Sequence, residues 1–331
     1  MNAGPRKVLR FALAFVVTLF FSYLVLRNVK PRELGAAAAQ VHWTTILLGL
    51  AFLVVEYWLR AVRWWLMLRS RVRNIPVRAC FWPIVVSVAI NNLVPLRMGD
   101  ALRVLGFRDQ LKAPAVHLLG TLIVERLLDM TILVAVFLAG LENVPQTGAS
   151  PFYNNLAVFL CSTVLACWIV VLTAGQWLQK FVVSVCSSGP LRARAWNVAA
   201  EQRALEFIAA LALIRPPRRA LELMVISALL WGCNGAIFCA VAEGLGYHGA
   251  FFGPCFSLAT ATLATLLPSS PGHLGTFDYF AVSGLMAYGA GRAMATIFAL
   301  LVHAALWLPT TVSGMTYLLS RGAKIRRLAR V

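Results

Sequence analysis

The chain has 331 residues, of which 60% are hydrophobic and 13% are charged, and its mean hydropathy is +0.78. No soluble domain of this size has such a composition, so the sequence predicts an integral membrane protein. The formal net charge is +18. Because the basic residues fall mainly in the links on one side of the predicted membrane, a nucleic-acid partner is excluded as the reason for this charge. The seven cysteines lie mostly in apolar runs without a CxxC pattern and are interpreted as packing residues.

Six apolar stretches are long enough to cross a bilayer, and the first is interpreted as a retained span rather than a cleaved signal peptide. They are 8–27, 42–66, 115–139, 153–175, 219–243 and 293–319. Two further apolar segments, 79–107 and 250–290, are interrupted by proline and glycine. Helix-breaking residues at membrane depth are tolerated only where the backbone is buried in protein or lines a cavity. Each of these segments is therefore predicted to be a re-entrant helical hairpin, and the fold class is all-α.

The breaks in the two hairpins are assigned to small, polar or cyclic residues. In the first hairpin they are Asn92, Pro95, Gly99 and Asp100, and in the second they are Pro268, Pro271, Gly272 and Gly275. A pair of interrupted segments in corresponding halves of a chain is a pointer to a transporter's binding site.

The basic residues predict the orientation of the chain. They concentrate near the N-terminus, after the second and fourth spans and in the tail, whereas 140–152 and 244–252 contain none. Both termini are therefore predicted to be cytoplasmic. The first hairpin then enters from the cytoplasmic face and the second from the outer face. Residues 1–141 and 142–331 become two halves of opposite orientation, which is the inverted-topology repeat of many alternating-access carriers.

One segment between the fourth and fifth spans, about 190–212, is too polar to insert. It mixes arginine and glutamate with apolar residues. This pattern predicts an amphipathic helix on the cytoplasmic membrane surface.

The third span carries three ionisable residues, Glu125, Arg126 and Asp129. Such residues at membrane depth are functional candidates by default. Glu125 and Asp129 are four residues apart and share one helix face, and the nearest arginines in sequence are Arg97 and Arg103 of the first hairpin. Two interpretations stay open: an ion-pair cluster that fixes the hairpin against the span, and direct contact with a substrate.

Arg97 is the preferred headgroup ligand because it lies in the break of the first hairpin. A guanidinium presents several donors in a planar fork that suits phosphate, and Arg103 is expected to assist it. Asp100 is expected to cap the helix that starts beside it.

In the second hairpin, small polar side chains and one acid accompany an irregular backbone. The candidate binding residues there are Ser269, Ser270, His273 and Asp278. His273 is expected to cap a helix start, with ligand binding or proton exchange as the alternative.

Other polar residues in the spans are expected to have structural roles. Asn234 and His303 are predicted to form interhelical hydrogen bonds. Glu56 and Arg60 are spaced as an i,i+4 pair towards the cytoplasmic end of their span, where Arg60 and Arg63 are expected to snorkel to the interface.

No enzyme signature is present in the sequence. HExxH, GxSxG, P-loop and Cys/His metal-ligand patterns are all missing. We therefore predict that the protein is not an enzyme and binds no metal and no cofactor.

Three motifs together resemble one membrane-protein family. The stretch from Asn92 to Arg103 resembles its N-x-x-x-P-x-R-x-G-[ED]-x-x-R pattern, Glu125 to Asp129 resembles E-R-x-x-D, and Pro268 to Asp278 resembles P-x-x-P-G-x-x-G-x-x-[ED]. On these residues the chain resembles the lysylphosphatidylglycerol synthase transmembrane-region family of flippase-like proteins. It departs from the pattern where Asp replaces the more common Glu in both hairpins and where His273 replaces a usual glycine.

The resemblance implies a multi-pass protein of the bacterial inner membrane that moves a lipid between leaflets. The implied ligand is an anionic or phosphate-bearing lipid, either a phospholipid or a lipid-linked sugar. Because the chain ends at Val331, no domain that synthesises aminoacyl-lipid is expected.

Two alternatives to transport of lipid are open. One is a non-transporting membrane partner of a lipid-modifying or glycosyltransferase enzyme, and the other is an ion or small-solute carrier that uses the same repeat. A flippase needs a lateral opening towards lipid, whereas a solute carrier needs a cavity walled off from it.

Overall fold

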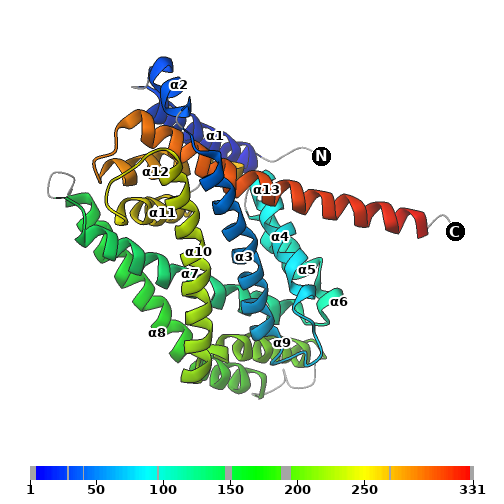
Figure 1. Ribbon diagram of the computed structural model, residues 1–331. Helices are drawn as coiled ribbons and strands as arrows, with labels where there is room; N and C mark the ends of the chain where they lie inside the picture. Colours follow the sequence, from blue (N-terminus) through cyan, green and yellow to red (C-terminus); the bar gives the residue numbers. More distant parts are fainter. Residues whose placement is uncertain are drawn as a thin grey trace.

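The computed structural model describes residues 5–27, 30–39, 41–94, 97–145, 151–187, 195–267 and 270–328, and every regular element in these ranges is helical (Figure 1). Three predicted hairpin residues, Pro95, Pro268 and Ser269, lie outside the described residues.

Among the described residues, four helices are long and apolar enough to cross a membrane. They are α3 (Trp43–Leu68), α8 (Pro151–Ser187), α10 (Pro217–Gly244) and α13 (Arg292–Leu328). They correspond to the predicted spans 42–66, 153–175, 219–243 and 293–319, except that α3 begins one residue later than predicted. The other two predicted spans fall on α1 (Pro5–Leu26) and on α7 (Ala115–Glu142), which at 28 residues is about 42 Å long but carries three charges near its centre.

The antiparallel helices α3 and α10 lie side by side in the middle of the molecule (Figure 1). Small residues allow the close approach: a Cβ on Gly49 would lie 3.3 Å from that of Ala240. At one end of the pair, the backbone N–H of His42 donates to the Gly244 carbonyl at 2.7 Å. This pair is the frame around which the shorter helices are arranged.

The first interrupted segment is a helical hairpin. Helix α4 (Arg78–Leu93) ends before the break, and α5 (Met98–Leu105) returns along it, followed by α6 (Arg108–Leu111). The return is tight because a Cβ on Gly99 would overlap the carbonyl oxygen of Ser87. At 16 and 8 residues, α4 and α5 extend only about 24 and 12 Å, which is less than the roughly 30 Å of a hydrocarbon core.

The second interrupted segment is also a helical hairpin, formed by α11 (Phe252–Ala264), the 3-10 turn η4 (Pro271–His273) and α12 (Thr276–Met286). The Ser257 hydroxyl donates to the Ala281 carbonyl at 2.7 Å, which ties the two antiparallel helices together. Gly272 and Gly275 have φ of +71° and +80°, backbone conformations that favour glycine.

The tips of the two hairpins meet. The Arg97 guanidinium donates to the Thr265 carbonyl at 3.4 Å, and a Cβ on Gly272 would lie 3.3 Å from the Asn92 carbonyl. Helix α13 passes both hairpins: Asn92 donates to Thr311 at 2.9 Å, and Gly314 lies close against α4. Segments about 170 residues apart in the chain therefore converge on one region.

Two further elements lie at opposite ends of the long helices (Figure 1). Helix α2 (Pro31–Ala39) lies at the end where α3 begins, in a link where sequence analysis predicts no helix. Helix α9 (Ala195–Leu211) falls inside the predicted amphipathic segment, continues into η3 (Ala212–Ile214) and packs on α7 and α8.

Candidate functional site

A polar cavity of about 180 Å³ lies where the hairpin tips meet, and it is bounded by α3, α4, α10, α11, η4, α12 and α13. Its polar and titratable lining includes Glu56, Arg60, Asn92, Asn234, His273 and His303. A concave pocket in which a few polar groups converge is the default candidate for a binding site.

On one wall, α3 contributes an ion pair. Arg60 Nε donates to Glu56 at 2.5 Å, as the i,i+4 spacing predicts, and the rings of Tyr57 and Trp231 lie 5.8 Å from the guanidinium. Glu56 is the fourteenth of 26 residues in α3, so it sits at mid-helix rather than towards the cytoplasmic end as expected.

On the opposite wall, His303 of α13 connects two parts of the second hairpin. Its Nδ1 lies 2.7 Å from Asp278 Oδ1, and its Nε2 lies 3.0 Å from the Gly272 carbonyl oxygen. The other carboxylate oxygen of Asp278 accepts the Gly275 N–H at 2.9 Å. His303 thus makes the predicted interhelical hydrogen bond and also lines the cavity.

Two buried donors near the cavity have no hydrogen-bond partner among the described residues: the Trp307 indole N–H and the Ser270 hydroxyl. Trp307 lines the cavity directly, and its Nε1 lies close to Gly272. A buried unpaired donor costs about 1–3 kcal/mol, so a ligand oxygen that accepts a hydrogen bond from it would be stabilising.

Arg97 reaches the edge of the cavity through its contact with Thr265, which lines it. The Arg97 side chain is exposed and its backbone is left-handed, with φ of 52° and ψ of 40°. His273, at φ of 56°, also lines the cavity. The hydroxyl of Thr276, the first residue of α12, donates to the His273 carbonyl at 3.1 Å.

The acids of α7 lie outside the cavity, in a buried ion-pair network. Arg103 forms a two-pronged contact with Glu125, at 2.7 and 3.3 Å, and stacks on the Trp64 ring at 3.8 Å. Arg63 pairs with Asp129 at 2.6 Å and with Glu125 at 3.4 Å. This network joins α3, α5 and α7.

Arg63, the central member of this network, was not among the predicted site residues. Arg63 was expected to snorkel, but its side chain is fully buried, so that expectation is wrong. Glu56, Arg60 and Arg63 follow the i, i+4, i+7 spacing of one helix face, which was the available signal.

Arg126 and Asp100 complete the network. Arg126 lies 3.6 Å from Asp100 and 3.8 Å from Asp129. The charges of the network therefore balance without a charged ligand. Its three acids are Asp100, Glu125 and Asp129, and its three arginines are Arg63, Arg103 and Arg126. Asp100 accepts from Asn91 and Ser87 of α4 at 3.1 Å rather than capping α5 as expected. Asn91 serves the helix start instead, because its side-chain oxygen accepts the Gly99 N–H at 2.8 Å.

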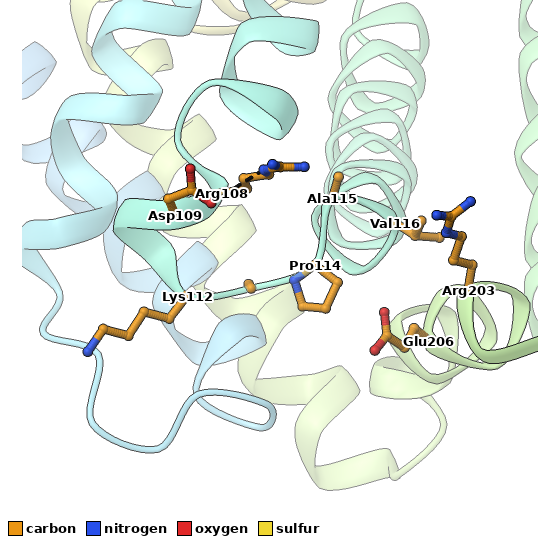
Figure 2. A pocket seen from close by; sticks show the side chains of 9 residues that line it. Arg108, Asp109, Lys112, Pro114, Ala115, Val116, Arg203 and Glu206 are labelled. Carbon is orange, nitrogen blue, oxygen red and sulfur yellow. Dashed lines mark ion pairs between the residues drawn. The ribbon is translucent and has the colours of Figure 1, made fainter. Parts of the chain in front are cut away.

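A larger groove of about 820 Å³ lies at the other end of the molecule, between the α6–α7 link and α9 (Figure 2). Its charged residues have both signs: Arg108, Asp109, Lys112, Arg203 and Glu206. In Figure 2 the Lys112 and Arg203 side chains point away from each other, so they do not converge on one ligand. Over the described residues, no three His, Cys, Asp or Glu side chains gather as a metal site.

The fold and the cavity define a class: a multi-pass helical membrane protein in which two helical hairpins meet at a polar cavity. The chain belongs to the family described as the lysylphosphatidylglycerol synthase TM region, whose model matches residues 8–314. The match includes all three sequence motifs and both hairpins. No curated protein and no solved structure gives a significant match.

Proposed function

We propose that this protein moves a phosphate-bearing lipid headgroup between the two leaflets by alternating access, without catalysing a chemical reaction. The observation that carries the proposal is the meeting of the two hairpin tips at a polar cavity that contains an unpaired indole donor. Irregular backbone inside a membrane protein is tolerated where it lines such a cavity.

The proposed membrane arrangement has six spans, formed by α1, α3, α7, α8, α10 and α13, and two re-entrant hairpins of opposite entry. Residues 1–141 and 142–331 are the two inverted halves. The short hairpin helices and their converging tips support this arrangement.

The proposed cytoplasmic end is the end at which α3 finishes, α10 begins and α9 lies (Figure 1). Basic residues gather there: Arg69, Arg71, Arg73, Arg108, Lys112, Arg203, Arg215, Arg218 and Arg219. By the positive-inside rule we propose that this end faces the cytoplasm of a bacterial inner membrane. The cytoplasmic location of both termini stays a prediction from the basic residues of the sequence.

In the proposed binding mode, the headgroup phosphate enters between the hairpin tips and the acyl chains stay in the bilayer. Arg97 supplies the charged fork, and the Trp307 N–H and the Ser270 hydroxyl supply unpaired donors. His273 lies beside them on the cavity wall. Ser269 keeps its assignment as a binding residue from the sequence alone.

In the described conformation, the Arg103 guanidinium is already paired with the Glu125 carboxylate. Contact between Arg103 and phosphate therefore requires Glu125 to release it. Until then, Arg103, Glu125, Arg126 and Asp129 hold the first hairpin against α7 and α3. Movement of one half against the other would exchange these contacts for contacts with the headgroup.

The test is lipid movement in proteoliposomes with the Arg97→Asn variant, since asparagine tolerates the left-handed backbone that Arg97 adopts. Fluorescent phosphatidylglycerol serves as the probe, and a membrane-impermeant reductant reports the outer-leaflet fraction. Loss of one charge-assisted hydrogen bond, about 1.5–3 kcal/mol, corresponds to a rate loss of about 10- to 150-fold.

The matched control is Lys112→Asn. Lys112 is also exposed and left-handed, with φ of 52° and ψ of 35°, and its loss removes the same charge far from the cavity. The control should move lipid at the wild-type rate. A folded Arg97→Asn protein that does the same would remove Arg97 from the site. Wild-type vesicles no faster than protein-free vesicles would favour the non-transporting partner.

A further inference from the structure

His303 faces two oxygen atoms that differ in what they can do. Gly272 presents a backbone carbonyl, which only accepts hydrogen bonds, and Asp278 presents a carboxylate oxygen, which accepts unless it is protonated. The side chains of His303 and Asp278 are 12% and 7% exposed, so water cannot freely replace either contact.

A neutral imidazole cannot satisfy both contacts when Asp278 is ionised. It carries one N–H donor and one acceptor nitrogen, so one ring nitrogen would face an oxygen with no hydrogen between them. Both distances, 2.7 and 3.0 Å, are those of made hydrogen bonds. The geometry therefore requires one more proton than a neutral histidine beside an ionised aspartate provides.

We propose that Asp278 and His303 form a binding site for a single proton, and that this proton fixes the tip of the second hairpin to α13. The proton is held either as an imidazolium beside a carboxylate or as a carboxylic acid that donates to Nδ1. In both forms Nε2–H donates to the Gly272 carbonyl, and the pair is neutral overall.

Loss of the proton has a structural consequence. The remaining ring proton stays on Nδ1, because its hydrogen bond to a carboxylate is charge-assisted and the stronger of the two. The Nε2 lone pair then faces the Gly272 carbonyl, and the contact becomes repulsive. Gly272 lies in η4, which lines the cavity and approaches Asn92 of the first hairpin. Deprotonation thus releases the hairpin tip at the point where the two halves meet.

The surrounding elements contribute other charged and titratable groups. They are Glu56, Tyr57 and Arg60 on α3, Arg97 beside α5 and His273 in η4. Glu56 and Arg60 neutralise each other at 2.5 Å. Among the described cavity-lining residues, α4, α10, α11 and the turn after α11 add non-titrating groups: Asn92, Trp231, Asn234, Thr262 and Thr265. His273 is the group whose titration must be separated from that of His303.

The direct test is ¹⁵N NMR of histidine-labelled protein in lipid nanodiscs from pH 5 to 9, with His303 assigned by its loss in His303→Gln. We expect Nε2 of His303 to carry a proton at low pH and to lose it as the pH rises. In Asp278→Asn, the amide donates to Nδ1 and Nε2–H persists across the range. His273→Asn, which suits the left-handed backbone, should leave the His303 titration in place.

An Nε2 of His303 that stays unprotonated throughout the wild-type titration overturns the proton site. An Asp278→Asn protein whose Nε2 titrates as in the wild type overturns the role of Asp278.

The use of this proton in transport rests on the proposed function and is measured separately. In the proteoliposome assay, the wild-type rates of lipid movement at pH 6 and pH 9 should differ. In Asp278→Asn the two rates should be equal. An unchanged ratio of the two rates in the variant overturns coupling to transport. Absence of lipid movement by the wild type overturns the proposed function and leaves the NMR result standing.

Discussion

Arg63 is the cation on which the buried network depends, so replacing it gives a sharp test. Its guanidinium contacts Asp129 at 2.6 Å, Glu125 at 3.4 Å and the Ser227 hydroxyl at 2.8 Å, and so ties α3 to α7 and α10. In Arg63→Met, three acids face two arginines in a buried site. Removing one partner of a buried ion pair costs about 3–5 kcal/mol, because the other charge remains uncompensated.

The assay is the free energy of unfolding in mixed micelles titrated with SDS. The double variant Arg63→Met, Asp129→Asn restores the charge balance, so it should be about 2–3 kcal/mol more stable than the sum of the single changes predicts. The control is Arg71→Met: Arg71 pairs with Glu206 at 3.5 Å but is 56% exposed, and its loss should cost about 1 kcal/mol or less. Equal losses for Arg63→Met and Arg71→Met, or strict additivity in the double variant, would mean that Arg63 does not balance a buried charge.

Two further changes test how the first hairpin is packed. Gly99→Ala places a methyl group against the Ser87 carbonyl and should cost about 1–3 kcal/mol by overpacking, seen as a lower thermal midpoint. Gly35→Ala, with open space around it, should leave the midpoint unchanged or raise it. Asn92→Ala removes the donor to Thr311 and should cost about 1 kcal/mol in the same measurement; no shift would mean that this bond to α13 contributes nothing.

The positions at which the chain reverses could be predicted from the sequence because their cause is local. Gly99, Gly272 and Gly275 stand where backbones approach closely or φ is positive, and only glycine suits these conditions well. The Glu56–Arg60 pair could be predicted for the same reason, since its partners are one helical turn apart.

The partners of Arg63 could not be predicted in this way. Asp129 is 66 residues away in the chain and Ser227 is 164 residues away. Helical spacing shows which residues share a face, but it does not show which helix that face meets. Snorkelling was a reasonable expectation for an arginine near the end of an isolated span, and packing between α7 and α10 reversed it.

A cavity between the hairpins was predicted from the sequence, but most of its lining was not. Its lining combines α3, α10 and α13 with the two hairpin tips, and Trp307 carries no local signal that distinguishes it from an interfacial tryptophan. Only the unpaired indole N–H beside Gly272 marks it.

The two hairpins are attached to the rest of the protein by different chemistry, and this difference indicates which tip moves more easily. The first hairpin is held by the buried Arg103–Glu125 contact, so that separating it exposes two opposite charges to low dielectric at a cost of several kcal/mol. In the second hairpin, the contact between His303 and Asp278 holds α12 to α13, whereas the tip at Gly272 is held to α13 by the hydrogen bond from His303 to its carbonyl. A single hydrogen bond contributes about 1 kcal/mol. Within the proposed alternating-access cycle, the tip of the second hairpin is therefore the part that detaches first, and the proton on His303 and Asp278 is the group that determines when.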